Sequence, residues 1–420
     1  MIFFSFIIFH NNIIEINRRN IISVAILVYI SIIFSEQYYL ENIHGMSFQV
    51  SDPSLYYLKT KDIDFQHFID SIITNENQDN FFYFFLNWIY QSGIKDPTFY
   101  AIAIKITNAM VFLLAYLFFF KDSTKKVSYI DLVLLFHPWL IYILIRNIRD
   151  SYIILFTSLL IHLSFKKKYN VTDIISISLI LSLMSVIRPF FIAPMLLILL
   201  ARIFNLSTNK QRKTLMIFIS AIALIFLFIY KDTITYNFTK YFMGNLIFFQ
   251  GENAVDNVEQ LYSDNIDSKS INTDLLNVVL SKVTISIPVF LFTPHPYNWF
   301  NKYLEFRENG MYGIYTDIDN VLIIAGSLIN YVITYPLFFK FIVNIRKVNI
   351  SFILITFFIL VMYSVFLLGN ADMRIRYTYI FFMVIGFHKS GLTLYKTRSD
   401  FNYLLASMII FLSIPFIIIT

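Results

Sequence analysis

Long apolar runs separated by short polar junctions dominate the chain. These runs lie at about 20–35, 98–120, 127–145, 151–165, 171–187, 190–205, 214–230, 319–341, 349–369, 378–388 and 402–419. About 20 apolar residues span the roughly 30 Å of hydrocarbon in a bilayer, and most runs reach or approach that length. The pattern predicts an all-α, polytopic integral membrane protein with about eleven transmembrane helices, in a range of roughly 10–13.

Two enlarged polar stretches interrupt the apolar runs, at 36–97 and 231–318, and both are rich in acidic residues. We expect them to be two outer, periplasmic loops of a single membrane domain that covers 1–420. The aromatic segment 81–90 is too short to cross, which predicts an interfacial helix or a partial dip. The segment 275–292 is apolar but contains Lys282 and Pro288, and a re-entrant or interfacial helix is expected there.

Lysine clusters predict the orientation of the chain. Lys166, Lys167 and Lys168 form one such cluster, and similar lysine groups recur at every second junction, as on the cytoplasmic side of membrane proteins. This places the N-terminus in the cytoplasm, with the first span as an uncleaved anchor; a cleaved signal peptide is the competing interpretation. Lys105 lies in the outer third of its span, from which its long side chain is expected to reach the surface.

The composition agrees with a membrane protein. Hydrophobic residues make up 57% of the chain and charged residues 14%, whereas a soluble domain keeps roughly a quarter of its residues charged. There is no cysteine, which excludes disulfides, thiolate metal sites and a cysteine nucleophile. No dinucleotide-binding, P-loop or zinc-protease motif occurs, so we expect no cofactor, no metal and no nucleic-acid partner.

Arginine, in contrast to lysine, marks the short outer junctions. These junctions carry Arg146, Arg149, Arg188, Arg374 and Arg376. A planar guanidinium with five donors matches phosphate or carboxylate in a bidentate way, whereas lysine suffices for orientation alone. The use of arginine at the outer junctions and lysine at the inner ones predicts an outward-facing site for a lipid-linked diphosphate. The competing interpretation is that these arginines touch lipid headgroups or pair with outer acids.

Two acidic residues could support the arginines. Asp150 directly precedes the next predicted helix, where a carboxylate can cap free backbone N–H groups, and a helix N-terminus beside Arg146 and Arg149 also favours anions. Asp372 could be a salt-bridge partner of Arg374 or Arg376. Both residues therefore have a structural interpretation as well as a supporting role at the site.

Two histidines precede prolines in the outer half of the protein. His137 stands before Pro138, and His295 stands before Pro296 in the second loop. Either imidazole could act as a base if it faces a cavity. A packed, hydrogen-bonded histidine and ordinary turn chemistry are the competing interpretations.

With these features the chain resembles bacterial polysaccharide polymerases of the O-antigen polymerase (Wzy-type) group, and their relatives among membrane glycosyltransferases of the C-type fold. The resemblance rests on the polytopic plan with two enlarged outer loops, and on three short motifs. These motifs are HP…RNIRD at 137–150, Arg188-Pro189 at the start of a span, and NADMRIRY at 370–377.

The resemblance implies an enzyme of the bacterial cytoplasmic (inner) membrane that builds O-antigen of lipopolysaccharide, capsule or exopolysaccharide. A glycan on undecaprenyl diphosphate would pass to a sugar hydroxyl of the next lipid-linked repeat unit. The implied partners are these lipid-linked glycans, membrane lipids, a chain-length regulator and a flippase. C-type transferases carry an acid in the first outer loop, and Asp52 is the nearest match; with His137 it is our candidate base. The paired-acid motif of many such enzymes is absent.

Three alternatives remain open at this stage. A C-type glycosyltransferase with a polyprenyl-phosphate sugar donor would share the topology and add one sugar rather than a ladder of repeats. A lipid-linked oligosaccharide flippase would be expected to show matching halves and short loops, which the sequence lacks. A structural or regulatory membrane protein would not need arginine at the outer junctions.

Overall fold

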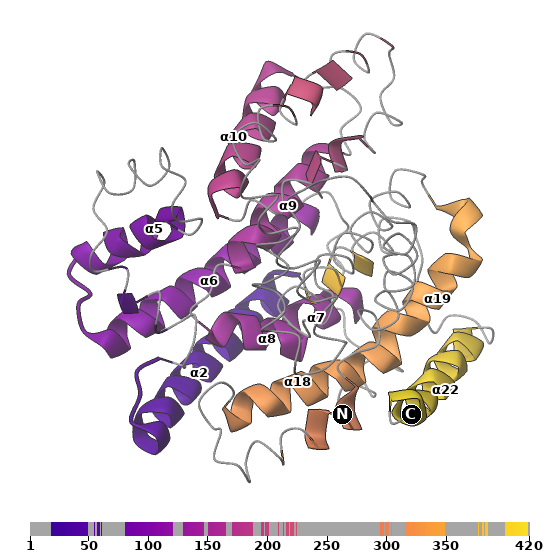
Figure 1. The fold of residues 1–420 in the computed structure, drawn as a ribbon, viewed down its shortest axis with the longest axis horizontal. Helices are drawn as coiled ribbons and strands as arrows, with labels where there is room; N and C mark the ends of the chain where they lie inside the picture. The colour runs from indigo at the N-terminus through magenta and orange to yellow at the C-terminus, as the bar shows by residue number, and fades with distance from the viewer. Residues whose placement is uncertain are drawn as a thin grey trace, which may run out of the picture.

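The structure is a computed structural model, and its described part is helical (Figure 1). It describes residues 18–48, 80–120, 129–146, 150–164, 170–187, 316–348 and 400–418, with individual residues within 54–60, 195–224, 295–304 and 377–384. No strand occurs among these residues, which agrees with the all-α prediction.

Ten α-helices have defined bounds in this part of the chain. They are α2 (Arg18–His44), α5 (Asn80–Gln91), α6 (Pro97–Phe120), α7 (Tyr129–Phe136), α8 (Pro138–Ile145), α9 (Asp150–Ser164), α10 (Val171–Ile187), α18 (Asp317–Ile329), α19 (Tyr335–Val343) and α22 (Asp400–Ile418). A π-helical turn, η3 (Asn330–Thr334), joins α18 to α19, and a 3₁₀ turn, η4 (Ile345–Lys347), follows α19.

Three helical stretches are long and apolar enough to cross a membrane: Asn20–His44, Pro97–Leu117 and Asp317–Val343. Shorter apolar helices at Asp131–Ile145, Asp150–Leu163, Val171–Met184 and Asp400–Leu412 coincide with four further predicted spans. The remaining predicted spans, at 190–205, 214–230, 349–369 and 378–388, lie largely or wholly outside the described residues. The total of about eleven spans therefore stays a prediction.

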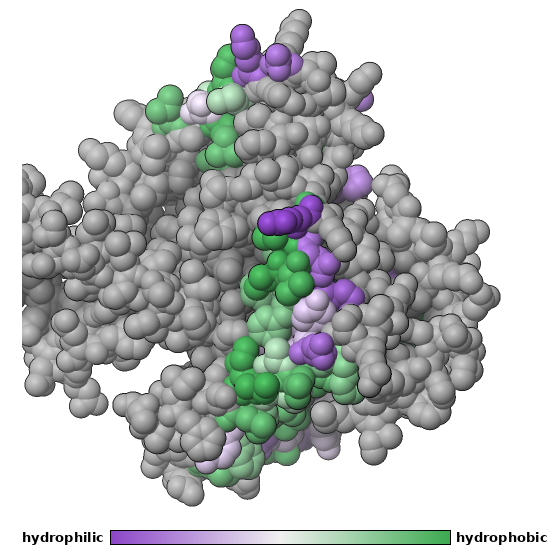
Figure 2. Space-filling model, turned by 90° about the vertical axis from the view of Figure 1, so that its right-hand side faces the viewer, coloured by the Kyte–Doolittle hydropathy of each residue, from purple (hydrophilic) through white to green (hydrophobic). Residues whose placement is uncertain are grey.

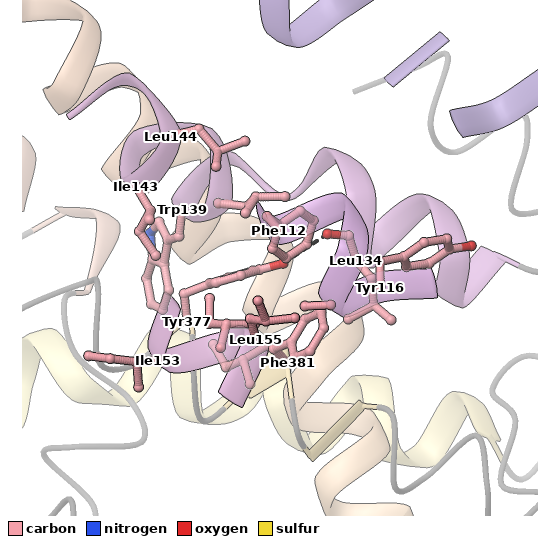
Figure 3. Close-up of a cluster of buried hydrophobic side chains, with 14 of the residues drawn as sticks. Phe112, Tyr116, Leu134, Trp139, Ile143, Leu144, Ile153, Leu155, Tyr377 and Phe381 are labelled. Atoms are coloured by element: carbon pink, nitrogen blue, oxygen red, sulfur yellow. Dashed lines mark hydrogen bonds between the residues drawn. The ribbon is translucent and has the colours of Figure 1, made fainter. Parts of the chain in front are cut away.

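The helices form a bundle around α6 and α8. Helix α6 packs along α9 and against α2, while α8 packs against α18, and α19 lies beside α22 (Figure 1). Figure 3 shows the core between them, where rings from α6 and the 377–384 segment meet. The ring centroids of Phe112 and Phe381 lie 5.5 Å apart and those of Phe112 and Tyr377 lie 6.4 Å apart, within the range of favourable aromatic contacts.

The predicted span at 127–145 is broken into α7 and α8. Pro138 has no N–H group, so the carbonyl of Leu134, four residues earlier, loses its helical partner. The Trp139 N–H donates to Nδ1 of His137 (3.1 Å) instead of to the carbonyl of Leu135. His137 thus caps the N-terminus of α8, and the predicted span at 127–145 corresponds to the helical stretch Asp131–Ile145 with a break at Pro138.

Tyrosine hydroxyls satisfy both carbonyls that the break releases. Tyr377 donates to the carbonyl of Leu134 (2.8 Å), and Tyr29 of α2 donates to that of Leu135 (2.6 Å). An unsatisfied buried carbonyl costs about 1–3 kcal/mol, and no water can replace the partner inside an apolar bundle. The two tyrosine hydroxyls therefore replace the lost backbone donors and stabilise the interrupted helix inside the core.

A second proline produces the π turn in the long helix 317–343. Pro336 cannot donate a hydrogen bond, and the N–H of the preceding Tyr335 donates to the carbonyl of Asn330, five residues back. The carbonyl of Tyr331 is left over, and the Ser407 hydroxyl of α22 donates to it. Both helix irregularities thus follow one rule, in which a hydroxyl from a neighbouring segment replaces the missing backbone donor.

The irregular segments contact each other through α8 and α18. Nε2 of His137 lies 3.1 Å from Oδ1 of Asn330, and the indole N–H of Trp139 donates to the carbonyl of Ile323 (3.0 Å). Gly326 permits this approach, because a Cβ built there would lie 2.2 Å from Cδ1 of Trp139. Glycine is needed here for space rather than for backbone conformation.

On the side of the molecule that carries α19 and α22, the described residues are largely apolar. Exposed Phe401, Leu405, Ile409 and Leu412 follow one another along α22 at helical spacing. Figure 2 looks onto this side, and the described side chains there form a largely green band with hydrophilic residues along one edge. Such a face suits contact with lipid chains, in line with the predicted membrane location.

Two predicted boundaries need comment. Helix α2 continues to His44, so residues 36–44, which the hydropathy pattern assigned to the first outer loop, are helical. The segment 81–90 is a helix, α5, of 12 residues, too short to cross a bilayer by itself. The segment 275–292 and most of the predicted loop 231–318 lie outside the described residues.

We predict that Gly326→Ala destabilises the protein by about 1–3 kcal/mol, because the new methyl group collides with the Trp139 ring. Thermal unfolding of the purified protein in detergent measures the loss. In a Trp139→Ala background the same substitution should cost little, since the ring is gone. An equal loss in both backgrounds would contradict the steric explanation.

We predict that Tyr377→Phe lowers the stability by roughly 1–3 kcal/mol, because it leaves the Leu134 carbonyl buried without a donor while keeping the ring in place. Tyr38→Phe is the matched control, since Tyr38 is 70% exposed. Thermal unfolding of the two variants should separate them clearly. A Tyr377→Phe variant as stable as the control would show that the carbonyl tolerates the loss.

Candidate functional site

Four charged side chains gather at one end of the bundle, and all four are buried. Glu36 lies in the last third of α2 and Lys105 in the first half of α6, while Arg146 follows α8 and Asp319 lies in the first turn of α18. Helices α2 and α8 run toward this end and α6 and α18 run away from it, so residues far apart in sequence meet here. We call these four residues the charge cluster.

Arg146 is held from three sides. Its Nη1 lies 3.5 Å from Oδ2 of Asp319 and donates to the Tyr142 hydroxyl (3.1 Å). Its guanidinium carbon lies 5.2 Å from the centre of the Tyr142 ring, in the range of a cation–π contact. Asn108 of α6 donates its amide to the Arg146 carbonyl (3.4 Å). The end of α8 is therefore attached to both α6 and α18.

Asp319 is oriented by the start of its own helix. Its Oδ2 accepts the N–H of Thr316 (3.0 Å), and the Thr316 hydroxyl accepts the N–H of Asp319 (3.2 Å), which is a capping box. The positive end of the helix dipole stabilises the carboxylate at this position. Oδ1 of Asp319 is buried and has no hydrogen-bond partner among the described residues.

Lys105 forms the second pair of the charge cluster. Its ammonium group binds the Glu36 carboxylate and donates to Oε1 of Gln37 (2.9 Å). The side chain is only 1% exposed, so the expectation that it reaches the surface is wrong. A carboxylate on the adjacent helix gives the ammonium group a closer partner than water.

The two ion pairs form one electrostatic unit. Glu36 interacts with Arg146 and Asp319 as well as with Lys105, and Asp319 interacts with Lys105 as well as with Arg146. Two carboxylates and two cations give a net charge of zero. This balance is what makes burial possible, because removing one member of a buried pair costs roughly 3–5 kcal/mol. Ionisable groups within apolar spans are functional candidates for the same reason.

A further hydrogen bond joins α2 to α18 at this end of the bundle. The Tyr39 hydroxyl of α2 donates to Oδ2 of Asp317 (2.9 Å), beside the start of α18. Among the described residues no three His, Cys, Asp or Glu side chains gather as a metal site, and the two carboxylates of the charge cluster face cations.

The predicted site residues divide into two groups. Arg146 lies in the charge cluster, where its pairing with Asp319 matches the interpretation that outer arginines pair with acids. The remaining candidates Asp52, Arg149, Arg188, Asp372, Arg374 and Arg376 lie outside the described residues, and their roles stay predictions. Asp150 is buried in the first turn of α9, where a carboxylate stabilises the helix N-terminus.

The two histidines have structural contacts. Nδ1 of His137 accepts from Trp139 and Nε2 faces Asn330, so both ring nitrogens are engaged. His295 repeats the arrangement, with Nδ1 accepting from the Tyr297 N–H (3.3 Å) and Nε2 donating to the Phe411 carbonyl (2.8 Å). Burial lowers the pKa of His295, which favours the neutral imidazole that these bonds require. The packed, hydrogen-bonded interpretation therefore describes both residues.

Sequence reasoning missed Asp319 and the roles of Glu36 and Lys105. Asp319 lay at the predicted start of a span, and Glu36 was one of many acids assigned to the first loop. Two signals were available: Thr316 and Asp319 stand three residues apart before an apolar run, as in a capping box, and Lys105 is a charge inside an apolar run.

Comparisons with protein-family models, with curated proteins and with solved structures find no match to this chain. The chemistry and geometry of the residues themselves are therefore the basis for assigning a function.

We predict that Arg146 and Asp319 are strongly coupled. Arg146→Gln and Asp319→Asn should each lose roughly 3–5 kcal/mol, because each removes one of the two opposite charges of a buried ion pair. The double variant leaves no unpaired charge from this pair and should be more stable than either single variant. Thermal unfolding of the unaltered protein and the three variants completes a double-mutant cycle. If the two single losses simply add in the double variant, the pair does not act as a unit.

Proposed function

We propose that this protein is a membrane polysaccharide polymerase, which joins oligosaccharide repeat units carried on undecaprenyl diphosphate at the outer face of the cytoplasmic membrane. The observation that carries the proposal is the buried guanidinium of Arg146, at the end of the bundle that the lysine pattern predicts to face outward. A buried arginine is suited to binding phosphate, because its planar donors fit two phosphate oxygens at once.

The reaction needs stabilisation of a leaving group. A hydroxyl oxygen of the acceptor sugar attacks the anomeric carbon of the donor glycan, and the bond from that carbon to the phosphate oxygen breaks. The lipid diphosphate leaves with the bonding electrons, and the hydroxyl proton passes to a base. Positive groups fixed in a water-poor site stabilise the charge that develops on the departing oxygens.

The roles of the other residues follow from the same chemistry. Arg149, Arg188, Arg374 and Arg376 are proposed to complete the binding of the diphosphate, with Asp150 and Asp372 orienting them. Asp52 is the better candidate base, because both nitrogens of His137 already form hydrogen bonds. No step of the transfer requires a cofactor.

A transferase that adds one sugar from a polyprenyl phosphate is the nearest alternative. It would use the same arginine chemistry at the same side of the membrane. The length of the product separates the two enzymes, since a polymerase gives a ladder of repeats and the transferase a single addition.

A lipid-linked oligosaccharide flippase is a second candidate that specific observations favour. Transporters place ionisable residues and interrupted helices inside the membrane, and this protein has a buried charge cluster, a break at His137 and a π turn at 330–334. In a deletion strain, unflipped repeat units on the cytoplasmic side would favour the flippase. Surface product with one repeat unit would favour the polymerase.

We predict that Arg146→Lys reduces chain extension at least about tenfold, because the ammonium group keeps the charge but loses the bidentate donors. The assay is the ladder of glycan lengths from a deletion strain that carries each variant. Arg346→Lys is the matched control, since this arginine is exposed and lies near the opposite end of the 317–343 helix. A normal ladder from Arg146→Lys, with equal protein in the membrane, would contradict the proposed role in phosphate binding.

A further inference from the structure

The charge cluster contains a cation that the arginine pattern of the outer junctions does not include. Lys105 lies within a candidate membrane span, is 1% exposed and is paired with a carboxylate rather than with lipid or water. Burying a lysine together with its carboxylate at this depth is expensive, and a purely structural bundle would often be as stable with well-packed apolar residues in place of both. Its presence beside Arg146 therefore calls for a ligand.

Lys105 and Arg146 share an electrostatic environment. Asn108, one helical turn after Lys105 on α6, donates its amide to the Arg146 carbonyl (3.4 Å), so the two cations lie at the same end of the bundle. Each cation is paired with one carboxylate. An ammonium group has three donors, and two of those of Lys105 have partners in Glu36 and Gln37. The start of α18 adds further positive potential at the same place. Two cations and a helix N-terminus are groups that bind the oxygens of an anion.

We infer that Lys105 and Arg146 together form one binding site for a diphosphate group, and that Glu36 and Asp319 occupy the anion positions of this site when no ligand is present. The inference rests on the proposed function, because it assigns the diphosphate of the carrier lipid to this site. It adds Lys105 as a binding residue and gives the two carboxylates a role as internal competitors.

The charges permit such an exchange. A diphosphate diester carries two negative charges, the same number as the two carboxylates that it replaces. The cations therefore keep a counter-charge throughout. Asp319 retains the N–H of Thr316 and the helix N-terminus after it separates from Arg146, so its carboxylate is not left without donors. Its unpartnered Oδ1 indicates that the present pairing leaves part of the carboxylate unused.

Binding of undecaprenyl diphosphate to the purified full-length protein in lipid nanodiscs tests the inference, with inorganic diphosphate as the soluble probe. The double variant Glu36→Gln/Lys105→Gln removes one ion pair without leaving an unpaired charge from it. It should bind the lipid at least about tenfold more weakly, the loss expected for a charge-assisted hydrogen bond. The double variant Lys340→Gln/Asp400→Asn, which removes the half-buried pair between α19 and α22, is the matched control and should bind normally.

The single variant Glu36→Gln separates a binding site from a structural ion pair. It keeps Lys105 but removes the competing carboxylate, so it should bind undecaprenyl diphosphate more tightly than the unaltered protein. Size-exclusion chromatography and thermal unfolding select the variants that fold. Weaker binding by folded Glu36→Gln, or normal binding by the folded Glu36→Gln/Lys105→Gln variant, would overturn the inference.

Two further outcomes distinguish this inference from the proposed function. If inorganic diphosphate binds as tightly as the lipid and depends equally on Lys105, the site exists but its ligand is a free anion, and the assignment to the carrier lipid is overturned. If lipid binding depends on both Lys105 and Arg146 while a deletion strain accumulates unflipped repeat units on the cytoplasmic side, the binding site stands and the polymerase proposal fails.

Discussion

Charge pairing inside an apolar bundle is the constraint that organises this protein. Glu36, Lys105 and Asp319 come from three helices and Arg146 directly follows a fourth, and each would be costly to bury by itself. Their mutual contacts connect α2, α6, α8 and α18 at one end of the bundle. Since separating the helices would break these buried ion pairs, the four helices are held in one relative arrangement at that end.

The same constraint governs the backbone. Pro138 and Pro336 each remove a helical hydrogen bond, and each break lies where another segment supplies a hydroxyl. His137 and Asn330 join the two irregular segments to each other. In water such breaks would be repaired by solvent, but in an apolar interior the donor must come from the protein. The tyrosines and serine at these positions therefore belong to the fold as much as the apolar core does.

The charge cluster connects this architecture to the proposed chemistry. An ion pair between internal groups can stabilise the protein without a ligand and still provide cations for one, provided that the entering anion replaces the carboxylates. A polymerase and a flippase both require a diphosphate to be recognised at the membrane, so the cluster suits either. The predicted outward position and the arginine-rich junctions favour the polymerase, whereas the interrupted helices are the feature that a transporter would share.

The amino-acid sequence by itself determined the helical class, the approximate bounds of the helices at 98–120, 151–165, 171–187, 319–341 and 402–419, and Arg146 as a residue of interest. These features depend on local periodicity and on charges that flank apolar runs, which a single chain displays directly. The break at Pro138 was not predicted, although a proline inside the run at 127–145 removes a known backbone bond.

Only the tertiary structure decided the partners. Lys105 and Glu36 are separated by 69 positions and Arg146 and Asp319 by 173, so no local pattern connects them. The expectation that Lys105 reaches the surface was reasonable for a single helix in lipid, and it is wrong because an adjacent helix carries a carboxylate at the same depth. In a low-dielectric interior the neighbour across the helix interface determines whether a charge is paired, and that neighbour is set by packing rather than by sequence order.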